Sequence, residues 1–478
     1  MIPLSVAQVA QATGASLAGG IDPAALVTGP VVIDSRAAEA GSLFAALPGT
    51  RVDGHDFAGQ ALSAGAVGVL AERPVGGPAL VVPDVQAALG KLARAVYDCA
   101  PDLTVVAITG SMGKTTTKDL TAQLLETHGP TVAPHGSFNN EIGHPLTVLR
   151  ITSKTRYLVS ELSARGIGHI AALCQIAPPR LGAVLCVGHA HAGEFGGLDQ
   201  IALAKSELPA ALPADGVAVL NADDPRVAAM ASQTAARVLR FGRSAAAEVR
   251  AEQVQTDEMG RAGFTLVTPA GAAPVQLRLY GEHHVYNALA AAALAGELGM
   301  APDAIAAGLS AAEARSRFRM EVTRLESGVT VINDAYNANP DTVRAALTAL
   351  TTMSRGGRGF AVLGHMTELG DAADALHEEV GARVAAAGLA GLIVVGEEAA
   401  SILTGAKAVP GWPGEMLLVP DAAAALRELR NRLRAGDVVL VKASHSVGLE
   451  RLALALTGER PLAEAETEAA AQHGGTRR

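Results

Sequence analysis

The segment from Thr109 to Thr117 carries the residue types that bind the phosphates of a nucleotide. It reads Thr-Gly-Ser-Met-Gly-Lys-Thr-Thr-Thr and lies between an apolar run at 103–108 and a helical pattern. Glycines let backbone N–H groups close around phosphate oxygens, and a helix N-terminus favours the same negative charge. We expect Lys114 to reach the terminal phosphates and the Thr115 hydroxyl to hold a magnesium ion. Because Ile108 stands where the common phosphate loop has its first glycine, an ordinary glycine-rich turn is the alternative.

Further polar residues follow predicted strands, which is where ligands bind in open α/β sheets. Glu161 ends a strand at 157–160, and His191 follows a strand at 183–187. With Thr115 they would give a set of hard oxygen and imidazole ligands for a magnesium ion between a nucleotide and an acidic substrate. Alternatively, Glu161 is a carboxylate at a helix N-terminus and His191 an ordinary loop histidine. His189, two residues earlier, could exchange roles with His191.

Lys205 occupies an unusual position in a predicted helix at 198–212. The apolar stripe of this helix runs through Leu198, Ile201, Leu208 and Leu212, and Lys205 falls on the same face. A lysine there must extend its ammonium group to solvent, pair with an acid, or be chemically altered.

The segment at 332–340 leaves a strand and enters a helix. Asn339 suits the N-cap of that helix and Pro340 its first position. Capping does not explain Asp334, Tyr336 or Asn337, so these residues are candidates for a binding site.

Composition excludes several classes of protein. A chain of 478 residues is long enough for about three domains. A net charge of -9 and an aromatic content of 3% argue against a nucleic-acid binder. No basic segment opens the chain and no apolar run approaches the length of a membrane span, so we expect neither signal peptide nor membrane span. Three widely spaced cysteines suit a reducing compartment. These features predict a cytoplasmic protein.

Alternating strands and helices predict an α/β fold in three domains, because such alternation builds mostly parallel sheets. We place the domains at 1–100, 101–315 and 316–462, followed at 463–478 by a tail without apolar periodicity that we expect to be disordered. The predicted strands lie at 31–36, 42–47, 68–71, 79–82, 103–108, 157–160, 183–187, 217–220, 329–332, 360–363, 392–395 and 438–441. A long helix is expected at 86–100, an antiparallel patch at 250–279, and two alanine-rich helices within 285–314.

The motifs resemble those of the Mur ligases, the ATP-dependent amide-forming enzymes of peptidoglycan precursor synthesis. Residues 109–116 match the family's short phosphate loop, which accounts for the missing first glycine. Residues 332–340 resemble the signature of the member that joins D-alanyl-D-alanine to a UDP-N-acetylmuramoyl tripeptide. The segments 34–36, 41–44, 53–55 and 136–145 are similar to other family motifs, so the resemblance covers about residues 25–455.

This resemblance implies an N-terminal UDP-substrate domain, a central phosphate-loop ATPase domain and a C-terminal doubly wound, Rossmann-like domain. It implies a ligase that forms an acyl phosphate with ATP and completes the precursor pentapeptide in the cytoplasm. Small-molecule substrates, a monomer, two magnesium ions and a carbamylated Lys205 are further expectations. The implied nucleotide-binding residues are Thr109, Gly110, Ser111, Gly113, Lys114, Thr115, Thr116, Asn287 (to adenine), Arg317, Asp334 and Tyr336. The implied substrate contacts are Ser35, Arg36, Asn337 and Asn339, the metal ligands Thr115, Glu161, His191 and Lys205, and the catalytic residues Lys114, Lys205 and His191.

The chain departs from the family pattern at three histidines. His284 replaces an asparagine on the adenine side, His365 an acidic residue, and His445 an arginine in the C-terminal pattern. Two other functions remain open, a folylpolyglutamate synthase-like ligase with the same acyl-phosphate chemistry and a phosphate-loop ATPase that acts as a switch. The motif at 334–340 and the N-terminal motifs speak against the first.

Overall fold

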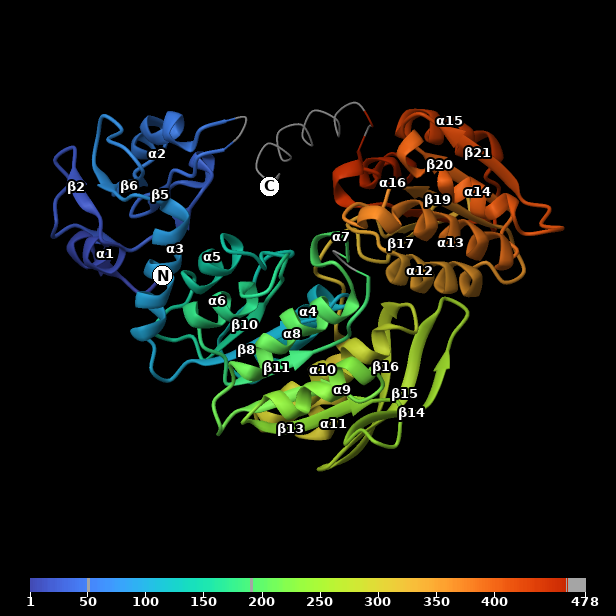
Figure 1. Cartoon of the computed structure of the whole chain (residues 1–478), viewed down its shortest axis with the longest axis horizontal. Helices are drawn as coiled ribbons and strands as arrows, with labels where there is room; N and C mark the ends of the chain where they lie inside the picture. Colours follow the sequence, from blue (N-terminus) through green and yellow to red (C-terminus); the bar gives the residue numbers. More distant parts are fainter. Residues whose placement is uncertain (50–51, 190–191, 461, 463–478) are drawn as a thin grey trace.

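The computed structural model of the chain describes residues 1–49, 52–189, 192–460 and 462. These residues form three α/β units, each built on its own large sheet, and the units follow one another along the chain (Figure 1). The predicted α/β fold class with three domains is therefore confirmed, whereas the exact domain bounds remain predictions. The expected tail at 463–478 lies outside the described residues. Within the described ranges, no helix is both long and apolar enough to cross a lipid bilayer.

The N-terminal unit has a five-stranded sheet in the order β2-β7-β6-β5-β4, parallel except for the edge strand β2, and a separate antiparallel pair β1–β3. Its strands are β1 (Leu4–Ser5), β2 (Ser16–Ala18), β3 (Leu26–Val27), β4 (Val31–Val32), β5 (Leu43–Ala45), β6 (Gly68–Ala71) and β7 (Ala79–Val81). Its α-helices are α1 (Val6–Thr13), α2 (Ala58–Ser63) and α3 (Val85–Asp98).

The strand predicted at 31–36 is wrong beyond residue 32. Asp34 Oδ1 accepts a hydrogen bond from the backbone N–H of Arg36 at 2.9 Å. This contact caps a short 3₁₀ helix, Ser35–Ala37, because an aspartate side chain can satisfy the N–H two residues on.

The central unit is a nine-stranded sheet in the order β16-β15-β14-β13-β12-β11-β8-β10-β9. Strands β9 to β14 pair in parallel, and β14, β15 and β16 form the predicted antiparallel patch. The strands are β8 (Thr104–Thr109), β9 (Thr131–Val132), β10 (Tyr157–Glu161), β11 (Leu181–Val184), β12 (Val217–Asn221), β13 (Arg237–Gly242), β14 (Val249–Thr256), β15 (Arg261–Thr268) and β16 (Gly271–Tyr280). The α-helices are α4 (Lys114–Glu126), α5 (Gly143–Val148), α6 (His169–Ile176), α7 (Ala192–Phe195), α8 (Leu198–Ala210), α9 (Pro225–Ala229), α10 (His284–Glu297) and α11 (Pro302–Ala311).

Strand β8 lies between β10 and β11, so the carboxyl ends of the three strands meet at one edge. This edge brings the phosphate loop, Glu161 and the segment after β11 together, as expected for an open parallel sheet. The strand predicted at 183–187 ends three residues earlier, at Val184. The chain then turns along the phosphate loop, where the carbonyl of Cys186 accepts from the N–H of Ser111 at 2.9 Å.

Helix α10 packs between α4 and strands β11 to β14. Its alanine run at 290–293 is 0–1% exposed, so the helix is buried on every side. Small side chains permit close approach of the neighbouring helix. The first turn of α10 therefore lies directly against the start of α4, where the phosphate loop ends.

The C-terminal unit is a six-stranded sheet in the order β17-β18-β22-β19-β20-β21, parallel except for the edge strand β17. Its strands are β17 (Glu321–Arg324), β18 (Thr330–Asn333), β19 (Gly359–Gly364), β20 (Gly391–Val395), β21 (Glu415–Val419) and β22 (Val438–Lys442). The α-helices are α12 (Pro340–Met353), α13 (Ala373–Ala386), α14 (Ser401–Lys407), α15 (Ala422–Arg432) and α16 (Glu450–Thr457). As predicted, Asn339 caps α12, with its side chain accepting from Thr342 N at 2.9 Å.

The packing of α13 on α14 gives a stability prediction. A Cβ at Gly381 would lie 1.8 Å from the carbonyl oxygen of Ile402 and 2.8 Å from Ala406 N, both of them backbone atoms of the opposite helix. Because neither atom can move alone, we expect Gly381→Ala to lower the free energy of unfolding of this unit by about 3 kcal/mol. Trp412, the only tryptophan, packs on the same core and reports the transition by fluorescence in a urea titration.

Gly296→Ala provides the control for this prediction. Gly296 is also helical, but the nearest atom to its added Cβ is 3.8 Å away. The control should leave the Trp412 transition in place. An unchanged urea midpoint in Gly381→Ala would show that the two helices can separate at little cost.

Candidate active site

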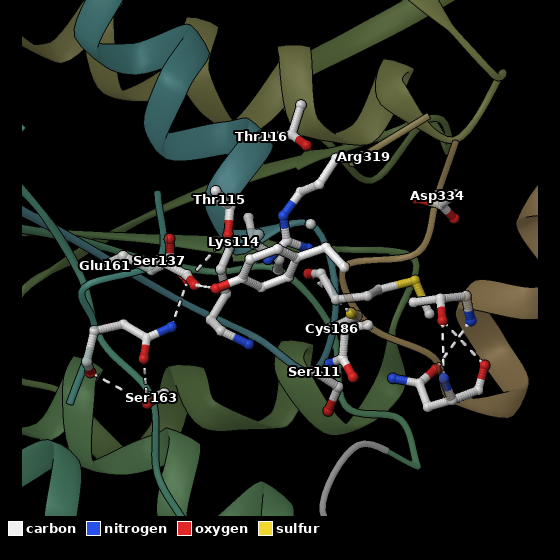
Figure 2. Close-up of a pocket in the computed structure, with 18 of the residues that line it drawn as sticks. Ser111, Lys114, Thr115, Thr116, Ser137, Glu161, Ser163, Cys186, Arg319 and Asp334 are labelled. Atoms are coloured by element: carbon white, nitrogen blue, oxygen red, sulfur yellow. Dashed lines mark hydrogen bonds between the residues drawn. The ribbon is translucent and has the colours of Figure 1, made fainter. Parts of the chain in front are cut away.

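A cavity of about 1130 Å³ lies between the central and C-terminal units, and its lining combines residues of both (Figure 2). Of the site residues predicted from the sequence, those that line it are Ser111, Gly113, Lys114, Thr115, Thr116, Glu161, Asn287, Asp334, Tyr336, Asn337 and Asn339. The predicted phosphate loop thus faces the predicted motif at 332–340 across one cavity, although the two are more than 200 residues apart in the sequence.

The phosphate loop is shaped by a glycine that no other residue could replace without strain. Gly113 has φ +79° at the start of α4, and a Cβ there would lie 2.3 Å from Asn287 Oδ1. Lys114 follows it, and its Nζ donates to the carbonyl of Gly110 at 2.7 Å. Burial lowers the pKa of Lys114, whereas the nearby Glu161 carboxylate acts in the opposite direction. The loop therefore presents a half-buried lysine and the N-terminus of a 13-residue helix to the cavity.

The carboxylate of Glu161 is held by two hydrogen bonds to one of its oxygens. Its Oε1 accepts from Thr115 Oγ1 at 3.2 Å and from Asn139 Nδ2 at 2.7 Å. The orientation of the Asn139 amide is fixed in turn, because its Oδ1 accepts from Ser163 Oγ at 2.9 Å. The second oxygen, Oε2, is buried and has no hydrogen-bond partner among the described residues.

A hard cation fits this arrangement. Buried carboxylate oxygens are normally satisfied, and a magnesium ion would satisfy Oε2 beside the Thr115 hydroxyl. Within the part of the chain that the structure describes, no group of three or more His, Cys, Asp or Glu residues gathers around a possible metal position. Magnesium does not require such a group, because it usually has only one or two protein ligands and otherwise binds phosphate oxygens and water.

Lys205 lies in α8 beneath the cavity rather than in its lining. The residue is 5% exposed, and no carboxylate of a described residue acts on its charge. Burial and the nearby Lys114 cation lower its pKa to about 7. The side chain is therefore almost completely shielded from solvent, which speaks against an ammonium group that extends to water.

The structure describes only one of the two histidines predicted after β11. His191 lies outside the described residues. His189 contacts the C-terminal unit, because Asp341 Oδ2 accepts from its backbone N–H at 2.9 Å and lies 3.1 Å from its Nδ1. Its ring is thus engaged at the boundary between the units.

The C-terminal wall of the cavity is built around the ring of Tyr336. The Arg319 guanidinium lies over this ring, 4.2 Å from its centroid, and the His445 ring stacks on it at 5.0 Å. The Tyr336 hydroxyl hydrogen-bonds to Ser137 Oγ of the central unit. One aromatic side chain therefore joins an arginine, a histidine and the opposite unit.

Asp334 is held within the C-terminal unit. Its Oδ2 accepts from Lys442 Nζ at 2.6 Å and its Oδ1 accepts from Met320 N at 3.0 Å. Lys442 ends β22, next to the end of β18, so both residues arise at neighbouring strand ends. Burial lowers the pKa of Lys442, and Asp334 opposes this shift.

The arginine expected at the nucleotide faces elsewhere. Arg317 does not line the cavity, and its Nη2 contacts Glu459 at 2.6 Å and Glu321 at 3.2 Å. Arg319 lines the cavity instead. The residues on either side of Arg319 both have positive φ, 62° at Phe318 and 52° at Met320, and this turn directs it inward (Figure 2).

Four further predicted residues do not line the cavity. Thr109 Oγ1 donates to the carbonyl of Leu162 at 2.9 Å, and Gly110 contributes its carbonyl to Lys114. Ser35 and Arg36 lie in the N-terminal unit, where Ser35 Oγ donates to Gln60 Oε1 at 2.9 Å and exposed Arg36 pairs with Asp34. Any role in substrate binding would place them at a separate part of the site.

The residues that line the cavity without having been predicted as site residues include Asn139, Arg319 and Lys442. Lys442 had a usable signal, because it stands at the carboxyl end of a predicted strand. Asn139 and Arg319 lie in loops, and nothing in their spacing indicates which way their side chains face.

Comparisons with known proteins agree with this geometry. The Mur ligase middle domain matches residues 108–295, the Mur ligase glutamate ligase domain matches 318–445, and the Mur ligase family catalytic domain matches 30–97. Together these three matches cover most of the chain.

Curated relatives share the whole length. A UDP-N-acetylmuramoyl-tripeptide–D-alanyl-D-alanine ligase from Mycobacterium leprae is 47% identical, with 96% of this chain and 99% of the relative covered. An enzyme of the same name from Escherichia coli is 36% identical, with 95% of this chain and 99% of the relative covered.

Solved structures give the same result. A MurF crystal structure from Acinetobacter baumannii has a TM-score of 0.85 at 32% identity and covers 96% of this chain and 99% of its own. MurF ligase from Thermotoga maritima in complex with ADP has a TM-score of 0.78 at 31% identity, covering 92% of this chain and 99% of its own. With matched domains, whole-length relatives and a shared fold, this chain belongs to the Mur ligase family.

Proposed function

We propose that this chain is an ATP-dependent ligase that joins D-alanyl-D-alanine to a UDP-N-acetylmuramoyl tripeptide. The observation that carries the proposal is the cavity shared by the phosphate loop and the motif at 334–339. The relatives that bear this name match over nearly their whole length, which supports the same substrate pair. ATP as the phosphoryl donor is supported by the ADP complex of the Thermotoga maritima enzyme.

The chemistry follows from the charges around the cavity. A carboxylate is a poor acyl donor and must first be activated. One carboxylate oxygen of the tripeptide attacks the γ-phosphorus of ATP, and the bond between this phosphorus and the β,γ-bridging oxygen breaks. The products of this step are ADP and an acyl phosphate on the tripeptide. The dipeptide amine then attacks the acyl carbon, the carbon–oxygen bond breaks, and phosphate departs as the amine loses a proton. Lys114 lies where it offsets repulsion between the triphosphate and the attacking carboxylate.

The residues around Glu161 would hold magnesium in this scheme. Thr115 and Glu161 supply hard oxygen ligands, and Asn139 orients the carboxylate. When bound, the cation would neutralise phosphate charge during transfer. A second ion, with ligands from His191 and a carbamylated Lys205, is part of the proposal. The burial of Lys205, which lowers the pKa of its amine to about 7, supports it.

The remaining roles are assigned by position. Asn287 lies beside the loop where the base of the nucleotide would extend, and Arg319, rather than Arg317, is the cation that faces the phosphates. Ser35 and Arg36 would contact the UDP-linked substrate from the N-terminal unit. Asp334, Tyr336, Asn337 and Asn339 complete the nucleotide and peptide contacts on the C-terminal wall. We further propose a monomer acting in the cytoplasm, in keeping with three free cysteines.

The first prediction of this proposal concerns substrates. Phosphate release from ATP should require both a UDP-N-acetylmuramoyl tripeptide and D-alanyl-D-alanine, because the acyl phosphate forms on one and is consumed by the other. The measurement is phosphate release together with mass detection of the pentapeptide product. Turnover with D-glutamate in place of the dipeptide would assign the chain to another reaction of the family. ATP hydrolysis that ignores both substrates would favour a switch ATPase.

Lys114 gives a second prediction. Lys114→Ala should lower kcat by about 10²–10³-fold, the usual effect of removing one transition-state contact to a developing charge. The fold should survive, because the hydrogen bond that the lysine makes is to a carbonyl of its own loop, Gly110. Steady-state kinetics and circular dichroism test both statements. The matched control is Lys154→Ala, an exposed lysine of the same unit, and near-normal turnover in Lys114→Ala would refute the assigned role.

Lys205 gives a third prediction, which concerns carbon dioxide. A pKa of about 7 leaves a neutral amine that can react with carbon dioxide at and above neutral pH. Protein treated with ¹³C-bicarbonate should therefore show a carbamate ¹³C resonance that Lys205→Ala lacks. Because protonation removes the nucleophile, this resonance and the activity should both decline as the pH falls through about 7.

An arginine variant separates a carbamate from a simple positive charge. Lys205→Arg keeps the charge but cannot form the anionic ligand, so it should be as inactive as Lys205→Ala. Lys154→Arg is the exposed control. Full activity in Lys205→Arg, or an unchanged ¹³C spectrum in Lys205→Ala, would rule out the carbamate.

A further inference from the structure

The first turn of α10 contains a buried side-chain pair that helix capping does not explain. His284 is 4% exposed and Asn287 6% exposed, and Asn287 Nδ2 lies 3.0 Å from His284 Nδ1. The N-cap of α10 makes no side-chain capping hydrogen bond, so neither residue is used to start the helix. Both line the cavity beside the phosphate loop.

The direction of this hydrogen bond is fixed by chemistry. An amide nitrogen can only donate, so His284 Nδ1 must accept and the ring proton must sit on Nε2. Burial and the neighbouring His283 lower the pKa of His284 well below its ordinary value, which keeps the ring neutral and its Nδ1 lone pair available. The ring of His283 packs against it, with the centroids 4.1 Å apart and the two planes tilted by 43°.

A fixed amide nitrogen also fixes the amide oxygen. With Nδ2 directed to His284, Oδ1 of Asn287 points to the phosphate loop, only 2.3 Å from where a Cβ on Gly113 would lie. Asn287 therefore offers the nucleotide an acceptor, and it cannot reverse without losing its bond to His284. An asparagine at 284, usual in the resembling family, could donate or accept, so the two amides could reverse together.

An acceptor at this position selects among the groups of a nucleotide. Phosphate oxygens only accept hydrogen bonds at neutral pH, so they cannot pair with Oδ1. The donors of ATP are the 6-amino group of adenine and the ribose hydroxyls, whereas guanine carries an oxygen at position 6. If the buried Asn287 oxygen faces another oxygen, or no donor at all, it forms no hydrogen bond. The free-energy cost of removing it from water is then not offset.

We propose that His284 is a positioning residue that holds the Asn287 amide with its oxygen toward the nucleotide, so that the site selects the 6-amino group of adenine. This inference rests on the proposed function for the identity of the nucleotide. It adds His284, which acts on the base only through Asn287. It also assigns the selectivity for adenine to the Oδ1 atom of the Asn287 amide.

The first test uses nucleotide binding by the whole wild-type protein, measured by calorimetry, because binding does not require ligation. The probes are ADP, purine riboside diphosphate, which lacks only the 6-amino group, and GDP. We expect Kd to rise about ten- to hundredfold for purine riboside diphosphate and at least as much for GDP. Equal Kd values for ADP and purine riboside diphosphate would overturn the inference, as would failure of ADP to bind.

The second test changes the positioning residue. His284→Leu conserves volume but cannot accept from Asn287, so the Kd ratio of purine riboside diphosphate to ADP should fall toward one. His284→Gln can accept from Asn287 but can also donate to it, so the two amides can reverse together and the ratio should fall to a value between those of the wild type and His284→Leu. The matched control is His128→Leu. His128 contacts the far end of α10, because its Nε2 lies 3.1 Å from the carbonyl of Leu298, the residue that follows this helix. This control should keep the wild-type ratio.

These outcomes separate a positioning role from a structural one. A merely structural His284 would weaken all three diphosphates equally and leave the ratio unchanged in His284→Leu, and this would overturn the inference even if overall affinity fell. Should His284→Leu fail to fold, the wild-type series and His284→Gln still decide the matter, because a full wild-type ratio in His284→Gln would show that a fixed acceptor at position 284 is not needed. Normal binding ratios without pentapeptide formation would count against the proposed ligase reaction alone.

Discussion

Burial of the Glu161 carboxylate is the electrostatic constraint on which the arrangement of the site depends. A charged group removed from water is stable only when its oxygens are paired, and here one oxygen is held by Thr115 and Asn139 while the other has no partner among the described residues. Burial lowers the pKa of the nearby Lys114, and its amine donates to the carbonyl of Gly110 rather than to this carboxylate. The protein therefore holds an incomplete set of charges that a cation and phosphates would complete.

The boundary between the central and C-terminal units places the complementary charges. Arg319 and Lys442 come from the C-terminal side, and the ring of Tyr336, over which Arg319 lies, hydrogen-bonds through its hydroxyl to Ser137 on the central side. Such a site exists only when the two units are close. A reaction that passes through an acyl phosphate benefits from this design, because bringing the units together also keeps water away from the intermediate.

Much of this arrangement was predictable, and the exceptions have physical reasons. Strands β8, β10, β18 and β22 were expected from apolar runs. Strands β8 and β10 are neighbours in the central sheet, and β18 and β22 are neighbours in the C-terminal sheet. In each sheet the polar residues at the carboxyl ends meet, because parallel strands end at the same edge. Arg317 was expected at the nucleotide, but the positive φ angles on either side of Arg319 reverse which arginine faces inward. Backbone angles of this kind leave no trace in periodicity. The strand expected through Arg36 fails for a similar reason, since a single aspartate side chain is enough to turn the backbone into a 3₁₀ helix.

The alanine content of α10 links packing to specificity. A helix without large side chains can lie in the interior between α4 and the sheet, and this brings its first turn against a loop that itself has no side chain at Gly113. At such short range the Asn287 amide has no space to shift away from the loop and rotate. Its orientation must then be set by a buried neighbour, and in this chain that neighbour is the His284 imidazole, whose Nδ1 lies 3.0 Å from the amide nitrogen. Close packing of small residues thus gives an ordinary asparagine a defined direction, on which the proposed contact to a nucleotide depends.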